Sequence, residues 1–229
     1  MNVQKLASRV RHAVLAGALC LMAGVASATV ALQEGVNYKL LQPAQPTSAA
    51  PGRVEVVEVF WYACPHCYHL EPSVVSWAKN APKDVVFKRM PAASGGWDKL
   101  ASVYFTLEAM GILDQYHAKV FDAIHKQNIN LAMPAVREEW LAKQGIDVAK
   151  YKDVEKSFAV MTKIQRAKQM SASYKVENVP MVVVDGKYVV TATSAGSQER
   201  IFQAVDQAIA IARREKGLAA APAPEVAKR

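Results

Sequence analysis

The sequence predicts an α/β fold in which two strand-containing segments are separated by a block of helices. Residues 54–62, VEVVEVFWY, are rich in β-branched and aromatic side chains, which is typical of a strand. Helical spacing follows, and VVFKRM at residues 85–90 predicts a second strand. A strand–helix–strand unit of this kind places its two strands side by side and parallel. Strand character returns only at residues 181–191.

The first strand-containing segment is expected to cover residues 29–91. A short strand near Tyr38 is followed by QPAQPTSAAPGR, residues 42–53, whose Pro, Ala and Ser content predicts a loop. In the helix after the 54–62 strand, Pro65 is acceptable in the first turn and Pro72 is expected to kink the axis. Residues at helical intervals predict one face of this helix: Cys67, Leu70, Val74 and Trp77.

Residues 92–174 are expected to form an inserted block of helices. Helical spacing and closing glycines predict about four helices, at residues 97–110, 114–127, 134–144 and 151–174. The last is predicted as one long segment because apolar side chains recur through it at helical intervals, at Val154, Phe158, Met161 and Ile164. The helical block therefore interrupts the α/β fold.

The second strand-containing segment is expected at residues 175–216. Asp185-Gly186, between two apolar runs, is the strongest hairpin signal in the chain. A closing helix is predicted from Gly196 to about Lys216. Residues 217–229, GLAAAPAPEVAKR, predict a disordered tail.

Residues 1–28 have the layout of a secretory signal peptide. Basic residues without an acidic one, in MNVQKLASRVRH, precede an apolar run that ends at the small residues ASA. That run is too short to span a bilayer comfortably. We therefore expect cleavage after Ala28, loss of Cys20 with the peptide, and a soluble, exported mature protein.

Cys64 and Cys67 are then the only cysteines in a mature chain of 201 residues, which is 229 minus 28. Two cysteines do not make a disulfide-stapled scaffold, although export places the chain where disulfides persist. Removing the three basic residues of the signal lowers the net charge from +8 to +5. This modest excess, without a nucleic-acid motif, favours a solvated basic surface over binding to nucleic acid.

The two cysteines lie in a CPHC motif at residues 64–67, directly after the aromatic strand. A zinc site would need two further ligands, and His66 and His69 are poorly placed for closed tetrahedral geometry. A c-type haem would need histidine directly after the second cysteine, where the sequence has Tyr68. An inert bridge is chemically possible, but so small a loop stabilises little. We favour a working redox pair over these three alternatives.

The position of Cys64 at the start of a predicted helix favours its thiolate. Its sulfur would face free backbone N–H groups and the positive end of the helix dipole, and His66 can add a donor or a positive charge. A lowered thiol pKa stabilises the reduced pair relative to the disulfide, so such a protein tends to give its disulfide away. Cys67 lies one turn further along and is expected to be the less exposed, resolving thiol.

The chain resembles the DsbA family of exported thiol:disulfide oxidoreductases over most of its mature length. The resemblance rests on the CPHC motif after an aromatic strand, on Tyr68, on the helical insertion, and on Val179-Pro180 shortly before the hairpin. It implies a thioredoxin-like fold with an inserted all-helical domain. Pro72, five residues after the second cysteine, is a departure typical of thioredoxins, and it leaves the motif intact.

The resemblance also implies a role for Glu58 in the aromatic strand. In the family, a carboxylate at the matching position is buried beneath the cysteine pair and helps to move protons to and from the inner cysteine. The alternative is an outward-facing strand carboxylate, as we expect for Glu55.

Val179-Pro180 matches the family's cis-proline loop, which lies against the redox pair and offers backbone groups to an extended substrate. The alternative is an ordinary trans proline that opens a strand. Arg89, near a charged position of the family, is expected to be a plain surface residue. His117 and His125 on predicted helices are expected to be surface or packed histidines rather than catalytic ones.

The function that the resemblance implies is that of a periplasmic protein dithiol oxidase, which donates its Cys64–Cys67 disulfide to newly exported proteins. It implies a monomer that is reoxidised by an inner-membrane partner of the DsbB type. No cofactor or metal is expected, since the cysteine pair itself carries two electrons. Residues 29–53 are too short for the dimerisation domain of an isomerase, and Pro-His is the oxidase-type dipeptide rather than that of a reductase. A peptide-binding chaperone is the alternative from another class.

Overall fold

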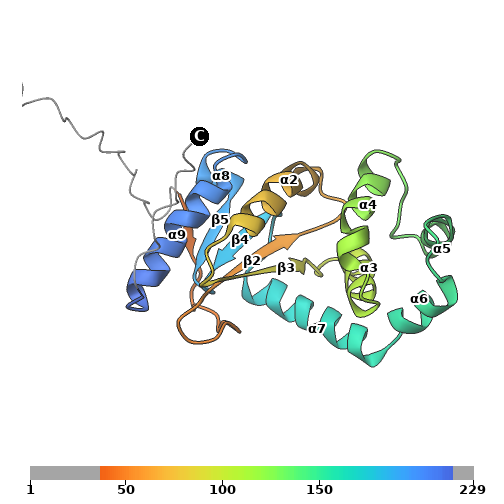
Figure 1. The fold of residues 1–229 in the computed structure, drawn as a ribbon, viewed down its shortest axis with the longest axis horizontal. Coiled ribbons are helices and arrows are strands. Elements are labelled where there is room, and N and C mark those ends of the chain that lie inside the picture. Colours follow the sequence, from red (N-terminus) through yellow and green to blue (C-terminus); the bar gives the residue numbers. More distant parts are fainter. Residues whose placement is uncertain (1–36, 219–229) are drawn as a thin grey trace, which may run out of the picture. The chain divides into compact units, whose positions relative to one another are not determined.

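The computed structural model describes residues 37–218. The predicted signal segment, residues 1–28, lies outside the described residues, and so does the predicted tail from residue 219 onwards. Within the described part, five strands form a mixed sheet in the order β1-β5-β4-β2-β3 (Figure 1). These strands are β1 (Lys39–Leu40), β2 (Val54–Phe60), β3 (Val85–Pro91), β4 (Met181–Val184) and β5 (Tyr188–Thr191).

The interior strand β2 is buried at every residue, because both of its edges and both of its faces are covered. It runs parallel to β3, with Glu58 opposite Arg89, and antiparallel to β4, with Val59 opposite Met181. The predicted parallel pairing of the two long strands is confirmed. Since successive side chains of a strand point to opposite faces, Glu55 and Glu58 face different sides of the sheet.

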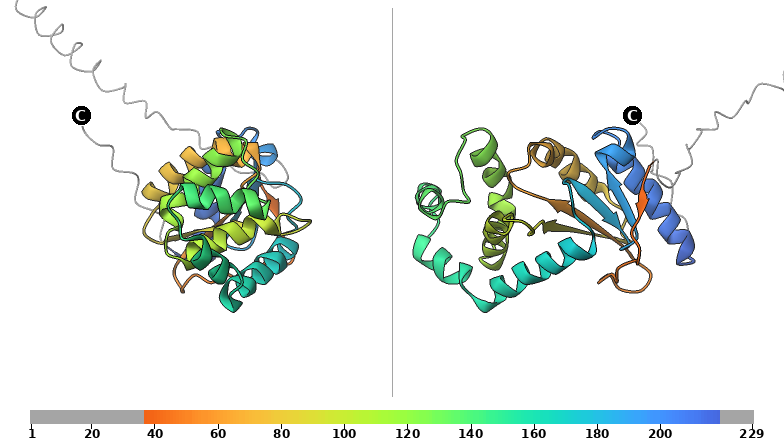
Figure 2. Two further views of the ribbon diagram at one scale, coloured as in Figure 1. Left: turned by 90° about the vertical axis from the view of Figure 1, so that its right-hand side faces the viewer. Right: turned by 180° about the vertical axis from the view of Figure 1, so that it is seen from behind.

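One face of the sheet packs against helices α2 (Pro65–Asn80) and α9 (Ile201–Glu215), as Figures 1 and 2 show. Val54 and Val56 of β2 lie in the cluster that these helices bury. The predicted inner face of α2 is also found: Cys67, Leu70 and Val74 are buried, and Trp77 packs against the same cluster. The helix continues through Pro72 to its last residue.

Five helices lie between β3 and β4 and make up the insertion (Figure 1). They are α3 (Asp98–Ala109), α4 (Leu113–His125), α5 (Pro134–Lys143), α6 (Val148–Glu155) and α7 (Phe158–Ser173). The last of them, α7, returns the chain towards the sheet, where β4 begins.

The single long helix predicted for residues 151–174 is wrong, because the chain breaks at Ser157. Ser157 has an extended backbone conformation, and its hydroxyl accepts a hydrogen bond from the backbone N–H of Val160, which caps the start of α7. The apolar spacing ran through this break but did not mark a buried face, since Phe158 is 84% exposed and Met161 is 54% exposed. The buried positions of α7 are Val160, Ala167 and Ser171.

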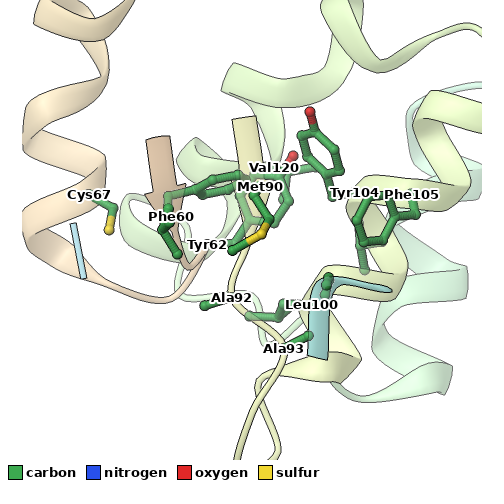
Figure 3. Close-up of a cluster of buried hydrophobic side chains, with 14 of the residues drawn as sticks. Phe60, Tyr62, Cys67, Met90, Ala92, Ala93, Leu100, Tyr104, Phe105 and Val120 are labelled. Atoms are coloured by element: carbon green, nitrogen blue, oxygen red, sulfur yellow. The ribbon is translucent and has the colours of Figure 1, made fainter. Parts of the chain in front are cut away.

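A continuous aromatic and aliphatic core joins the end of β2 to the insertion. Figure 3 shows Phe60 and Tyr62 between Cys67 on one side and Tyr104 and Phe105 of α3 on the other. Phe60 contacts Tyr62 and Tyr104 in edge-to-face geometry, with ring centroids 5.1 and 5.6 Å apart. The residues just before the cysteine motif are therefore anchored in the insertion as well as in the sheet.

The predicted hairpin is present, with Val184 opposite Tyr188. Asp185 and Gly186 both have positive φ, 52° and 65°, and a Cβ at Gly186 would overlap the carbonyl oxygen of Gln45, so a side chain there would clash. The closing helix differs from its prediction. Gly196, with φ 86°, ends the short helix α8 (Ala192–Ala195), and α9 begins only at Ile201.

Candidate active site

Cys64 is the N-cap residue of α2, and the local sequence explains why. Its backbone is extended (φ −83°, ψ 116°), and Pro65 occupies the first helical turn, where a missing N–H costs no hydrogen bond. The Cys64 sulfur accepts a hydrogen bond from the backbone N–H of Cys67 at 3.4 Å. A thiolate at this position thus lies at the positive end of a helix of 16 residues.

These surroundings lower the pKa of the Cys64 thiol from 9.0 to about 6. The largest cause is the hydrogen bond from the Cys67 thiol; the backbone N–H groups of Cys67 and His66 and the charge of His66 act in the same direction, while burial opposes them. Cys64 is 7% exposed, whereas Cys67 has no exposed surface. His66 itself is exposed, and its carbonyl oxygen accepts a hydrogen bond from the Gln198 side chain at 2.8 Å.

Cys67 has the opposite environment. It is completely buried, and burial raises the pKa of its thiol far above the ordinary value. The negative charge of the Cys64 thiolate and that of Glu58 raise it further. Both cysteines are free thiols. The pair therefore combines one slightly exposed cysteine, whose thiol ionises readily, with one fully buried cysteine, whose thiol holds its proton.

The Val179-Pro180 peptide bond is cis, as the family resemblance implied. The Cys64 thiol donates a hydrogen bond to the carbonyl oxygen of Val179 at 3.3 Å, across 115 residues of sequence. Pro180 is buried and Val179 is partly exposed. The loop before β4 thus lies directly against the more reactive cysteine.

Glu58 is 1% exposed, and it faces the side of the sheet that α2 covers. Its Oε2 accepts a hydrogen bond from Nε of Arg89 at 3.1 Å. Burial raises the pKa of Glu58 to about 7; the charge of Arg89 lowers it, and the charge of Glu71 raises it. A carboxyl group with this pKa can both give and take a proton near neutral pH.

Comparison with known proteins identifies the family of this chain. Residues 85–206 match the family model of the DSBA-like thioredoxin domain. The chain belongs to this family. A relative from Azotobacter vinelandii, named thiol:disulfide interchange protein DsbA, is 44% identical over 168 residues, which is 73% of this chain and 78% of the relative. The DsbA of Pseudomonas aeruginosa is 39% identical over 193 residues, 84% of this chain and 91% of the relative.

Solved structures lead to the same family. The crystal structure of Pseudomonas aeruginosa DsbA superposes with a TM-score of 0.75 at 40% identity, covering 80% of this chain and 95% of the other. DsbA from Xylella fastidiosa gives a TM-score of 0.73 at 27% identity, covering 80% and 98%. The predicted thioredoxin-like fold with a helical insertion is confirmed, and the chain is a thiol:disulfide oxidoreductase.

Two expectations about charged residues of this DsbA-family chain are wrong. Arg89 is not a plain surface residue: its side chain is 22% exposed and contacts both Glu58 and Glu71. Glu55 is not an outward-facing carboxylate, since it is 3% exposed and accepts hydrogen bonds from Lys88 and from the hydroxyl and backbone of Ser48. In both cases a partner from a distant segment covers the charge, which alternation along the strand alone does not reveal.

The sequence reasoning missed three polar residues that contact one another beside the redox helix: Glu71, Tyr62 and His117. Glu71 follows Cys67 by four positions, so helical spacing from the buried cysteine could have placed it on the inner face of α2. His117 was expected to be surface or packed, and it is packed, 5% exposed. His125 is partly buried and stacks on Tyr68, with ring centroids 4.7 Å apart.

Within residues 37–218, no group of three or more His, Cys, Asp or Glu side chains is arranged to hold a metal ion. The same range contains no helix that is long and apolar enough to cross a membrane.

Proposed function

We propose that this DsbA-family protein is a periplasmic dithiol oxidase that donates its Cys64–Cys67 disulfide to newly exported proteins. A substrate thiolate attacks the Cys64 sulfur of the oxidised pair, the Cys64–Cys67 bond breaks, and the Cys67 sulfur leaves and takes up a proton. A second substrate thiolate then attacks the substrate sulfur of the mixed disulfide and releases Cys64 as a thiolate. The substrate loses two electrons, which the cysteine pair gains.

The observation that supports disulfide donation is the difference in pKa between the Cys64 and Cys67 thiols. Cys64 leaves readily because its pKa is about 6, whereas the buried Cys67 keeps its proton. Relative to a thiol of pKa 9.0, a pKa of about 6 stabilises the reduced form at pH 7 by about 1.4 kcal/mol. For a two-electron couple this raises the reduction potential by about 30 mV, towards a disulfide donor.

We assign Glu58 the role of proton carrier for Cys67. It is buried beneath the redox helix, its charge acts on the pKa of the Cys67 thiol, and its own pKa of about 7 suits transfer in both directions. Glu58→Gln should slow turnover and leave the fold intact. Unchanged kinetics between pH 5 and pH 8 would remove Glu58 from the mechanism.

The loop before β4 is the proposed site for the substrate backbone. The Val179 carbonyl already accepts a hydrogen bond from Cys64, so an extended substrate bound along this loop would bring its cysteine to the reactive sulfur. Pro65 would fix the start of α2, and His66 would support the thiolate.

The proposed partners follow from the same chemistry. Reduced or unfolded exported proteins are the substrates, and an inner-membrane protein of the DsbB type removes the two electrons after each turnover. The protein would act as a monomer in the periplasm, with the cysteine pair as its sole redox group.

The test is stoichiometric oxidation of a reduced, unfolded protein by the oxidised enzyme, followed by mass spectrometry. Each Cys64–Cys67 disulfide consumed should form one substrate disulfide, and Cys64→Ser should abolish the reaction. A chaperone of the same fold would keep its protection of unfolded proteins in Cys64→Ser and would form no substrate disulfide. That outcome would mean that the protein functions as a chaperone and not as an oxidase.

A further inference from the structure

Buried polar side chains connect the redox helix to the helical insertion. Oε1 of Glu71, on α2, lies 2.7 Å from Nη2 of Arg89 and 3.5 Å from Nε2 of His117, on α4. Arg89 also donates from Nε to Glu58. Glu71 is 9% exposed and His117 is 5% exposed. A chain of contacts therefore runs from Glu58 through Arg89 and Glu71 to His117, and it crosses from the sheet into the insertion.

The hydrogen bond at the other ring nitrogen decides which nitrogen of His117 carries the proton. Its Nδ1 lies 2.7 Å from the hydroxyl of Tyr62. Burial raises the pKa of Tyr62 well above its ordinary value, so the phenol keeps its proton, and burial lowers the pKa of His117, so the ring is neutral at pH 7. A neutral ring that accepts a hydrogen bond from Tyr62 at Nδ1 carries its proton on Nε2, the atom that faces the Glu71 carboxylate.

Arg89 binds two carboxylates at once, and it lies closer to that of Glu71, at 2.7 Å, than to that of Glu58, at 3.1 Å. Burial is the main cause of the raised pKa of Glu58; the charge of Arg89 lowers this pKa and the charge of Glu71 raises it, so the balance between the two contacts of Arg89 modulates how readily Glu58 ionises. A second hydrogen-bond donor to Glu71 weakens the competition of Glu71 for Arg89, so the guanidinium interacts more strongly with Glu58. Nε2 of His117 is buried without a hydrogen-bond partner among the described residues and lies 3.5 Å from Oε1 of Glu71, so its N–H is placed to be that second donor.

We infer that His117 is a positioning residue for the thiol–disulfide reaction: by holding the Glu71 carboxylate, it keeps Arg89 engaged with Glu58. This inference rests on the proposed role of Glu58 as proton carrier for Cys67. His117 acts through two neighbours and touches no reacting sulfur in the proposed mechanism.

The other groups around the His117 ring do not take over its role as a donor to Glu71. The titratable and charged groups that face His117 come from each element packed against it, namely Tyr62 after β2, Glu71 on α2, Arg89 on β3, Tyr104 on α3 and Asp114 on α4. Phe60 and Phe121 also contact the ring, and they are aromatic and carry no charge. Removing the imidazole therefore removes one specific donor from Glu71.

The test follows the step in which Cys67 closes the disulfide after Cys64 has reacted with glutathione disulfide. This step needs Cys67 to lose its proton, so its rate should rise with pH through the ionisation of Glu58. In His117→Phe the midpoint of this rise should move upward by about 0.5 to 1 pH unit. His117→Gln, whose amide keeps a donor for Glu71, should restore at least half of the shift.

Two controls separate positioning from general damage to the fold. His125→Phe removes the other histidine of α4, which does not contact Glu71, and should keep the midpoint of the unaltered protein. The thiolate titration of Cys64, followed by ultraviolet absorbance, should stay close to that of the unaltered protein in every variant, because the main causes of its lowered pKa are Cys67 and His66 and not Glu58, Glu71 or His117. If His117→Phe does not fold, Tyr62→Phe/His117→Phe carries the same expectation without an unpaired hydroxyl.

The decisive comparison uses Glu71→Gln. Once Glu71 has no charge, His117→Phe should produce no further shift, whereas a role independent of Glu71 would give the same shift in both backgrounds. The second result overturns the inference, and so does an unchanged midpoint in His117→Phe. If Glu58→Gln also leaves the profile unchanged, the proposed role of Glu58 fails as well. If Glu58→Gln alters the profile and His117→Phe does not, only the inference about His117 fails.

Discussion

Glu58→Gln should make the protein less sensitive to alkaline pH, because Glu58 is a buried acid with a raised pKa. Between its unfolded pKa of about 4.5 and its folded pKa of about 7, the folded state holds a proton that the unfolded state has lost. The free energy of unfolding therefore falls as the pH rises through this window. A glutamine cannot titrate, so its variant lacks this loss.

The size of the effect follows from the two pKa values. For a single group shifted from 4.5 to about 7, the free energy of unfolding falls by about 2.5 kcal/mol between pH 5 and pH 8. Glu58 is 1% exposed, so solvent screening takes little from this figure. The unaltered protein should thus lose about 2.5 kcal/mol more than Glu58→Gln over this range.

The assay is urea denaturation of the oxidised protein at pH 5 and at pH 8, since no thiol titrates once the disulfide has formed. Glu55→Gln is the matched control on the other face of the same strand. Burial raises the pKa of Glu55, but its hydrogen bonds with Lys88 and Ser48 outweigh burial, and the net pKa is lowered. The stability that ionised Glu55 contributes is therefore lost below pH 5 and does not change between pH 5 and pH 8. An equal pH dependence in Glu58→Gln and the unaltered protein would refute the assignment of a raised pKa to Glu58.

Three further predictions concern the redox helix and its support. Titration of the thiolate absorbance of the reduced protein should give a midpoint near pH 6 for Cys64, and a midpoint above about 8 would contradict its stabilisation at the helix start. His66→Ala should raise this midpoint by about half a pH unit, because the charge of His66 lowers the pKa of Cys64; an unchanged midpoint would assign the effect to the thiol and backbone donors alone. Arg213→Met should lower the free energy of unfolding by about 2 kcal/mol without changing the reduction potential, because the buried guanidinium makes two hydrogen bonds to Asp84, at 2.7 and 2.6 Å. An unchanged urea midpoint would show that this pair adds nothing to stability.

The order of the elements could be predicted from the sequence because each carries a local signal. The β-branched run of β2, the proline at the start of α2 and the Asp185-Gly186 turn act over a few residues. The break at Ser157 also had a local signal, an N-cap residue, but the apolar spacing across it outweighed that signal. Spacing failed there because Phe158 and Met161 are exposed, so the pattern did not reflect burial.

The cysteine pair could be predicted as well, since a helix start next to two cysteines is a local arrangement. The charge network around it could not. Arg89 and His117 reach Glu71 from residues 18 and 46 positions further along the chain, and no local pattern brings them together. Glu55 and Glu58 look alike in the sequence, yet one is held by Lys88 and the other faces the redox helix. Such differences arise only from the packing of distant segments.

The most direct test of the central claim is the reduction potential of the Cys64–Cys67 pair, measured by equilibrating the mature protein in glutathione buffers. A donor of disulfides should give a value near −120 mV, which is about that of DsbA. A value near −270 mV, which is about that of thioredoxin, would make the protein a reductant and contradict its proposed role as an oxidase.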